Sequence, residues 1–248
     1  MLAYPLPPLF VASLAWDILR QHPRSFRRDA QHCTAALHPP LRVYGAEHIP
    51  SSGPCLLTVN HFARPGFQAW WIPLTISAQL SEEVHWISTA AWTFPNRPLA
   101  RNVLMPASRW VLHRLAQVCG FTAMPPMPPD PADVEARAQA VRRVLAYVHR
   151  SPRPLIGLAP EGRDAPDGSL LWPPPGAGRF ILQLAKAGLP IIPIGAFEDD
   201  AFCIRFGPAY HLPTYHSLAP DARDREARCA VMRAIAALLP ARLRGEFR

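Results

Sequence analysis

The chain has 248 residues, of which 49% are hydrophobic and 18% are charged, and its formal net charge is +8. This length suffices for one large domain with a buried core, and the hydrophobic content excludes a disordered or acidic-tail protein. The arginines are spread along the chain with no helix-turn-helix or RNA-binding signature, so we expect no nucleic-acid partner.

The stretch that precedes Asp17 carries no charged side chain and contains three prolines. No basic segment comes before its apolar residues, so we expect no secretory signal. A bilayer-spanning helix needs about 20 apolar residues, and this stretch is shorter. Beyond Pro8, apolar and aromatic residues are followed by several arginines. That pattern fits a helix in a lipid interface or a helix packed on the protein's own core.

Short apolar runs bounded by turn residues predict the strands of the first half, and helical spacing predicts its helices. In chain order we expect strands over 41–45 and 55–59, a buried helix over 67–80, a strand over 84–88, a helix over 103–115 with Val103, Trp110, Val111 and Leu115 inward, and a strand over 118–123.

A proline-rich loop over 124–131 opens the second half, and Asp130 before Pro131 predicts a helix start. The expected inward positions of that helix are Val134, Ala138, Val141, Leu145 and Val148. We then expect a strand over 154–159, a helix over 177–187 ended by Gly188, strands over 191–196 and 202–206, and a helix over 221–239 with Val231, Ile235 and Leu238 inward.

Alternating helices and strands that lack polar alternation predict an α/β fold, a single domain whose mixed, mostly parallel sheet is covered by helices. Within it we expect an N-terminal amphipathic helical segment over 1–40, suited to membrane-surface contact. The α/β domain proper would occupy 41–215, and a C-terminal helix over 216–248 would pack on it.

The five cysteines are scattered and form no Cys-x-x-Cys pair. We therefore expect neither a disulfide framework nor a metal site, and a reducing, cytoplasmic compartment. Cys55, Cys119 and Cys203 lie in apolar runs, where we expect buried thiols.

Two polar segments directly follow apolar strands, at the strand ends where α/β sheets bind ligands. The first contains His61, and a histidine in this place is suited to general-base catalysis near neutral pH. The second is the run Glu161-Gly162-Arg163, which brings together a carboxylate, a flexible backbone and a guanidinium. Each segment alone is more often structural than catalytic.

Together, in this order, the two segments resemble the glycerolipid acyltransferase family, which includes the 1-acylglycerol-3-phosphate acyltransferases. The resemblance covers roughly 41–213, and the run over 189–194 looks like the family's fourth motif. The first motif is Asn-His, four residues, then Asp; Asn60 and His61 match it, but Gly66 stands at the Asp position. The third motif is kept as Pro160 followed by Glu-Gly-Arg.

The resemblance implies a glycerol-3-phosphate acyltransferase-like fold and transfer of a fatty acyl group from an acyl thioester to a hydroxyl of a lysophospholipid or related lipid. The donor would be acyl-CoA or an acyl carrier protein, and no other cofactor is implied. In the family, the histidine takes the acceptor's proton while the Asp orients the histidine, so His61 is the expected catalytic residue. The alternative is a catalytically impaired member that binds acyl lipid without turnover.

Because the aspartate is missing, another group would have to orient His61. Gln68 and the Glu82/Glu83 pair are candidates for that role, and Gly66→Asp is expected to raise activity if the site has room. The resemblance also implies that backbone N–H groups near Gly162 stabilise the oxyanion.

The resemblance further assigns substrate binding to Asn60, Arg64, Glu161, Gly162 and Arg163. The second motif of the family carries a phosphate-binding Arg, but the corresponding stretch over 120–126 has none. Arg163 is therefore expected to hold the acceptor's anionic group, with Arg64 compensating and Glu161 positioning Arg163 or the acceptor.

Fewer arginines indicate an acceptor other than lysophosphatidate. We expect a cytoplasmic protein, peripheral on the inner face of the membrane. The acyl chain length, the donor carrier and the oligomeric state stay open at this point.

Overall fold

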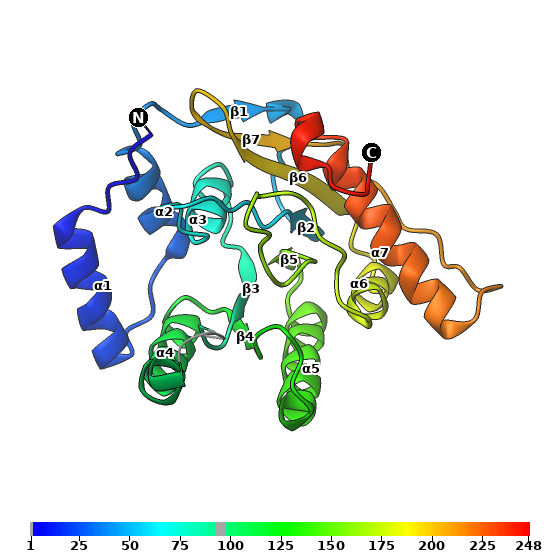
Figure 1. The fold of residues 1–248 in the computed structure, drawn as a ribbon, viewed down its shortest axis with the longest axis horizontal. Helices are drawn as coiled ribbons and strands as arrows, with labels where there is room; N and C mark the ends of the chain where they lie inside the picture. Colours follow the sequence, from blue (N-terminus) through cyan, green and yellow to red (C-terminus); the bar gives the residue numbers. More distant parts are fainter. Residues whose placement is uncertain (1, 93–97) are drawn as a thin grey trace.

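The computed structural model describes residues 2–92 and 98–248, except the side chains of residues 98–103. Within this part of the chain, seven strands form one sheet in the order β1-β7-β6-β2-β5-β3-β4 (Figure 1). The strands are β1 Arg42–Tyr44, β2 Cys55–Val59, β3 His85–Thr89, β4 Thr122–Met124, β5 Leu155–Leu158, β6 Ile191–Glu198 and β7 Phe202–Phe206.

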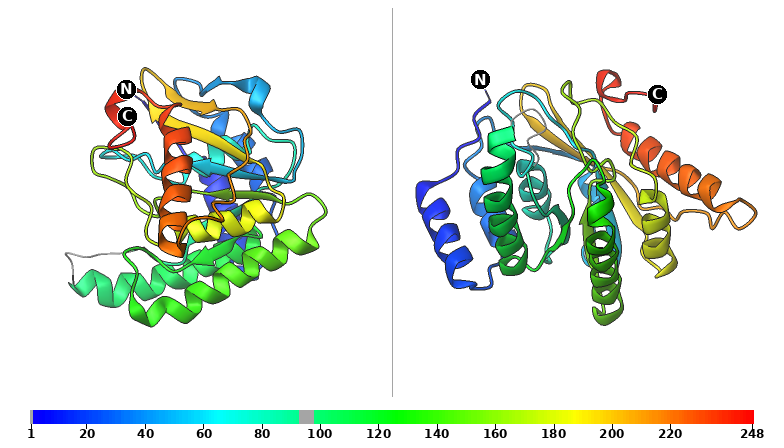
Figure 2. Two further views of the ribbon diagram at one scale, coloured as in Figure 1. Left: turned by 90° about the vertical axis from the view of Figure 1, so that its right-hand side faces the viewer. Right: turned by 60° about the horizontal axis from the view of Figure 1, so that its bottom comes forward.

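Helices cover both faces of the sheet. They are α1 Pro8–Arg20, α2 Phe26–Thr34, α3 Trp71–Ser77, α4 Pro98–Val118, α5 Val134–Arg150, α6 Ala177–Lys186 and α7 Pro220–Ala236. Helices α1, α2 and α3 lie on one side and α6 and α7 on the other, while α4 and α5 flank β4 (Figure 1). The right-hand view of Figure 2 shows the strands between these two groups of helices.

The sheet is mostly parallel, as predicted. Strands β6, β2, β5, β3 and β4 run in one direction, β7 is antiparallel to β6, and β1 is parallel to β7. The carboxyl ends of β6, β2 and β5 therefore meet at one edge of the sheet. All five residues of β2 and all four of β5 are buried, which explains why these strands read as continuous apolar runs.

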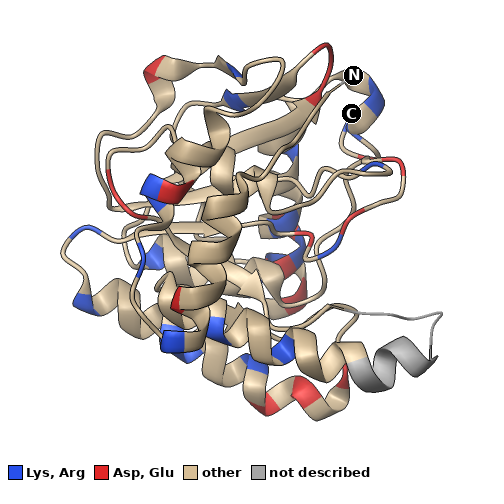
Figure 3. Ribbon diagram, turned by 90° about the vertical axis from the view of Figure 1, so that its left-hand side faces the viewer, with Lys and Arg blue, Asp and Glu red and all other residues tan. Residues whose placement is uncertain are grey.

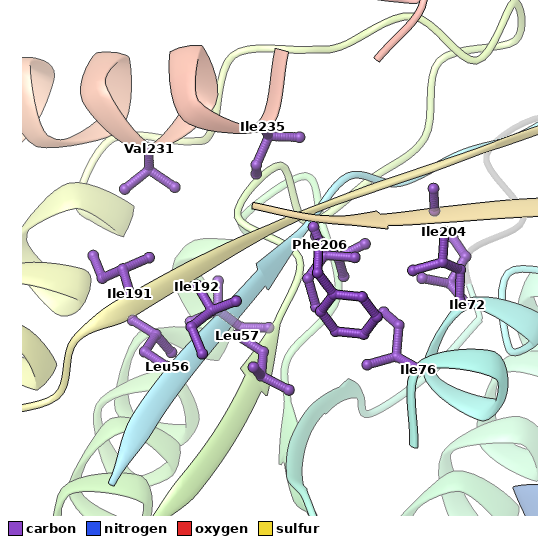
Figure 4. Packing of buried hydrophobic residues seen from close by; sticks show 14 of the residues in the cluster. Leu56, Leu57, Ile72, Ile76, Ile191, Ile192, Ile204, Phe206, Val231 and Ile235 are labelled. Carbon is purple, nitrogen blue, oxygen red and sulfur yellow. The ribbon is translucent and has the colours of Figure 1, made fainter. Parts of the chain in front are cut away.

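The core is built on both faces of these central strands. Leu56, Leu57, Ile191 and Ile192 come from β2 and β6, and Figure 4 shows them with side chains from α3 and α7, including Ile76 and Ile235. Truncating one such side chain to alanine costs about 2–5 kcal/mol in a well-packed core. This core fixes the strand ends that carry the polar segments.

Most elements lie where the sequence predicts them. Strands 55–59 and 202–206 match their predicted bounds, and the strand expected over 118–123 is shorter because α4 continues to Val118 and β4 begins only at Thr122. The helix expected over 67–80 is confined to Trp71–Ser77. Asp130 accepts a hydrogen bond from the Ala132 backbone N–H at 2.8 Å, ahead of α5.

The predicted inward faces of two helices are wrong in part, although Val148 of α5 is buried as predicted and Leu145 packs against the core. On α5, Val134 is 65% exposed, and the buried positions are Ala140, Val144 and Val148. The apolar repeat therefore marks one border of the buried face, not its centre. On α4, Trp110 and Val111 are exposed, and Val103 lies outside the described side chains. On α7, Val231 and Ile235 are buried as predicted.

The N-terminal helix packs on the core only at its edge, where half-buried Phe10 lies against the small hydrophobic cluster that includes Ala30 and Trp71. Helix α1 has no buried residue, and it contacts α4. Among the described residues, no helix has the length and apolar character needed to cross a bilayer. Helix α2 lies within the helical segment expected over 1–40, but the sequence did not predict it as a separate helix, because only Ala30 and Cys33 of this helix are buried.

Cys55 and Cys203 are buried, as predicted, whereas Cys119 is half-buried. Figure 3 shows Lys and Arg dispersed over several elements of one face, interspersed with Asp and Glu.

Candidate active site

The two polar segments meet at one edge of the sheet because β2 and β5 are parallel neighbours. Each segment leaves its strand at the carboxyl end. Glu161 Oε2 accepts a hydrogen bond from the His61 backbone N–H at 2.6 Å. Residues a hundred positions apart are thereby brought to one point, at the edge where open α/β sheets bind ligands.

Glu161 is the buried link of the site. Its side chain is 1% exposed, and its other oxygen, Oε1, accepts from the Leu171 backbone N–H at 2.7 Å. Burial raises the pKa of this carboxyl to about 8, and the two N–H donors oppose that shift. Glu161 thus holds two backbone segments together instead of lying against Arg163 or open surface, where substrate contact was expected.

Asn60 is the second buried polar residue. Its Oδ1 accepts from the Ala196 backbone N–H at 2.7 Å, and its Nδ2 donates to the Ala196 carbonyl at 2.9 Å. The side chain extends the pairing of β2 with β6 and fixes the backbone that leads to His61. This geometry gives Asn60 a positioning role and not the expected substrate contact.

The guanidinium of Arg64 is occupied by an ion pair with Glu198 and by a bond to the backbone. Its Nη2 donates to Glu198 Oε1 at 2.8 Å, its Nε also bonds Glu198, and its Nη1 donates to the Pro65 carbonyl at 2.7 Å. The Tyr4 hydroxyl donates to Glu198 as well, and burial together with this carboxylate raises the pKa of Tyr4. All three nitrogens of Arg64 have partners, so the arginine is poorly placed to compensate for missing phosphate contacts.

Glu198 and Tyr4 are site-edge residues that the sequence reasoning missed. Glu198 ends β6, next to the strand that carries His61, so its strand-end position was a usable signal. Tyr4 gave no signal, because it reaches Glu198 across 194 positions of chain.

Arg163 lies two residues past Glu161 and is exposed. Its guanidinium forms no hydrogen bond or ion pair with the described part of the chain. The neighbouring Gly162 is also exposed, and a side chain there would come within 3.0 Å of Met127 in the proline-rich loop. The Gly162 N–H donates to the Ala159 carbonyl at 3.2 Å, so this N–H is not the expected oxyanion donor.

His61 itself is half-buried. Burial lowers the pKa of its ring, and the negative charge of Asp164 acts in the opposite direction. Over the described residues, no side chain hydrogen-bonds to the ring. A histidine with a lowered pKa is neutral near pH 7, which is the form that can accept a proton.

The position expected to carry the family's aspartate is a turn. Gly66 has φ +81°, and a Cβ built on it would meet only the Arg64 Nη1, at 3.5 Å. Space exists for a side chain, but the left-handed backbone disfavours one, and Arg64 is the group it would meet first.

Glu82 and Glu83 do not replace this aspartate, and that prediction is wrong. Glu82 accepts from the Gly53 N–H at 3.3 Å and pairs with Arg153, and Glu83 bonds the start of α2. Gly53 precedes β2 whereas His61 follows it, and the five residues of a strand span about 16 Å. Gln68, the other candidate, is exposed and makes no hydrogen bond to His61.

Two surface hollows of about 470 and 360 Å³ lie beside Trp172 and the outer face of α7. Their charged lining residues include Arg225 and Arg233. His61 lines neither hollow.

Comparison with known proteins supplies two findings. A protein-family model described as Acyltransferase matches residues 40–196, a span that contains both polar segments. The chain is also similar to the crystal structure of the 1-acyl-sn-glycerophosphate (LPA) acyltransferase PlsC from Thermotoga maritima, with a TM-score of 0.54 and 14% identity over 86% of this chain and 78% of that one. At this identity the likeness shows the fold alone. No curated protein matches the chain.

Proposed function

Because the chain belongs to the acyltransferase family and has the α/β fold of a glycerolipid acyltransferase, we propose that it moves a fatty acyl group from an acyl thioester to a hydroxyl of a lysophospholipid or related lipid. One observation carries the proposal. The 2.6 Å hydrogen bond between Glu161 and the His61 backbone joins the two motif segments into one site. The thioester carrier is coenzyme A or an acyl carrier protein.

In the proposed reaction, the neutral ring of His61 accepts the proton of the acceptor hydroxyl as the oxygen attacks the thioester carbonyl. The new carbon–oxygen bond forms, the carbon–sulfur bond breaks, and the proton leaves with the thiol. No acyl-enzyme intermediate is needed. The lowered pKa of His61 supports this role, because the ring is already neutral when the acceptor binds.

Arg163 is the proposed contact for the acceptor's anionic group. It is the motif arginine whose guanidinium is exposed and has no partner in the part of the chain that the structure describes, whereas Arg64 is held by Glu198. A guanidinium binds phosphate oxygens in a two-pronged geometry. With one arginine in this role, the proposed acceptor has a weaker anionic head than lysophosphatidate.

The outer surface of α1 supports a peripheral location on the inner face of the membrane. Leu9, Trp16 and Leu19 are 85%, 55% and 62% exposed, and the Arg20 guanidinium lies 4.8 Å from the Trp16 ring centroid. On the contacting helix α4, Trp110 is exposed and carries Arg114 over its ring at 5.3 Å. Apolar side chains flanked by tryptophan and arginine suit an anionic lipid interface.

The experiment that tests the function incubates the purified protein with acyl-CoA and a panel of lysolipids and reads the products by mass spectrometry. We expect a new acylated lipid, and a decrease of about 10²–10⁴-fold in His61→Ala. The variant's circular dichroism serves as the folding control. Undiminished turnover in His61→Ala would contradict the proposal, and acyl lipid binding without any product would favour the non-catalytic alternative.

Membrane contact is tested separately by sedimentation with anionic phospholipid vesicles. We expect Leu19→Ser to weaken binding, while Val134→Ser, at an equally exposed apolar position on α5, leaves binding unchanged. Equal binding by both variants would contradict membrane contact through α1.

A further inference from the structure

Asp164 is a carboxylate next to the site that the proposed mechanism leaves unused. It follows Arg163 on the loop after β5 and is exposed. Its side chain forms no hydrogen bond or ion pair within the described residues. The question is whether the loop brings this carboxylate close enough to His61 to act on it.

The loop is fastened to the His61 segment on both sides of Asp164. On one side, Glu161 binds the His61 N–H at 2.6 Å. On the other side, Gly168 packs so closely that a Cβ there would lie 2.6 Å from the Ala63 carbonyl oxygen. The stretch between these two contacts therefore begins and ends beside residues 61–63.

The short connections to Glu161 and Gly168 limit the distance of Asp164 from the two points at which the loop is fastened. It lies three residues from Glu161 and four from Gly168. Consecutive Cα atoms are about 3.8 Å apart, so the Asp164 Cα is at most about 11 Å from that of Glu161. The charge of Asp164 accordingly raises the pKa values of both His61 and Glu161.

The other carboxylates of these segments are already committed. Both oxygens of Glu161 accept from backbone N–H groups. Asp167 accepts from the backbone N–H and the hydroxyl of Ser169. Glu198 binds Arg64 and Tyr4. Asp164 differs from these three because its carboxylate has no partner among the described residues and lies on the loop that is fastened to the His61 segment at both ends.

We propose that Asp164 is the acidic partner of His61 in this chain, in place of the aspartate that Gly66 replaces. It acts through His61, as a positioning residue. When the ring takes the acceptor's proton, the carboxylate stabilises the imidazolium until the proton passes to the departing thiol. The catalytic role of His61 that this inference deepens rests on the proposed function.

The test measures the titration of His61 directly. The ring resonances of the ten histidines are followed against pH by NMR, and His61 is identified by its absence in His61→Ala. In Asp164→Asn we expect the pKa of His61 to fall by about half a unit or more, because the charged ring loses its opposite charge. The other charged groups of the site, Glu161, Arg163 and the Arg64–Glu198 pair, stay unchanged in this variant.

Asp167→Asn is the matched control, since it removes a neighbouring charge on the same loop and keeps an oxygen for Ser169. We expect it to leave the His61 pKa in place. In the acyl-transfer assay, Asp164→Asn should lower kcat/KM about tenfold and move the acid limb of the pH profile downward with the His61 pKa.

An unchanged His61 pKa in Asp164→Asn would overturn the inference, as would an equal shift in Asp167→Asn. The NMR readout does not depend on turnover. If no acylated lipid forms but the His61 pKa still falls selectively in Asp164→Asn, the coupling holds and the proposed function fails.

Discussion

Two groups of polar residues share the same edge of the sheet and differ in what holds them. The buried pair, Asn60 and Glu161, has every side-chain oxygen or nitrogen bonded to backbone. The accessible trio, His61, Arg163 and Asp164, is half-buried to exposed, and its side chains have no hydrogen-bond partner within residues 2–92 and 104–248. Neighbouring residues of one sequence motif are therefore held in different ways, and we propose that the buried ones build the site while the accessible ones perform its chemistry. Substitutions should separate these two tasks.

The largest combined effect is expected at the buried pair, in Glu161→Ala. It leaves the N–H groups of His61 and Leu171 without their acceptor, and each unsatisfied buried group costs about 1–3 kcal/mol. We expect the free energy of unfolding to fall by a similar amount and activity to fall about a hundredfold, since His61 loses its support. Chemical denaturation and the acyl-transfer assay measure both effects. A loss of activity at unchanged stability would place Glu161 with the trio instead.

Asn60→Ala should affect stability next most strongly. It unpairs the N–H and carbonyl of Ala196, and we expect a loss of about 1–2 kcal/mol of unfolding free energy. Activity should decrease in parallel, because the backbone that leads to His61 loosens. Thermal unfolding checks the first effect. An unaltered Tm would show that Asn60 does not hold β2 to β6.

Arg163→Gln tests the accessible trio, where we expect an effect on substrate binding and none on stability. We expect unchanged stability and a rise of about tenfold in KM for an anionic acceptor, equivalent to about 1.4 kcal/mol of binding. Arg142→Gln, at an exposed arginine of α5 paired with Glu135, is the matched control and should leave KM unchanged. Equal KM values in both variants would exclude Arg163 from acceptor binding.

The smallest effect is expected from Gly66→Asp, which restores the family's residue but not its geometry. At φ +81° the new carboxylate first meets Arg64, and we expect less than about a twofold gain in kcat/KM, equivalent to about 0.4 kcal/mol. Steady-state kinetics decides this point. A large gain would show that the new carboxylate reaches His61, and it would remove the need for Asp164.

The sequence alone did not predict which polar residues of the site are buried and bonded to backbone and which are accessible. Apolar runs located β2, β5 and β7 well, because a strand buried on both faces leaves a strong local signal. The motif segments were located for the same reason, since each follows such a strand. The partners of the motif residues were not predictable in this way, because strand order brings Ala196 beside Asn60 and the fold of the loop after β5 brings Leu171 beside Glu161.

The buried faces of helices and the positions of distant carboxylates were also hard to predict, because both depend on how the elements pack together. The repeat on α5 is apolar at Val134, yet burial depends on what the helix packs against, and its buried face is centred on Val144. Glu82 was a plausible acidic partner only while the edge of the sheet on which it lies was unknown. Its bond to Gly53 at the start of β2 settles that edge.

The pH dependence of kcat/KM for wild type and His61→Ala is the measurement that bears most closely on the proposed role of His61 as the general base. A base with a pKa lowered from the ordinary 6.5 by burial gives a rate that rises with pH and levels off, with its inflection below that value. We expect this inflection in wild type. In His61→Ala we expect the inflection to disappear and kcat/KM to fall by at least about a hundredfold. The same inflection in His61→Ala would contradict this role.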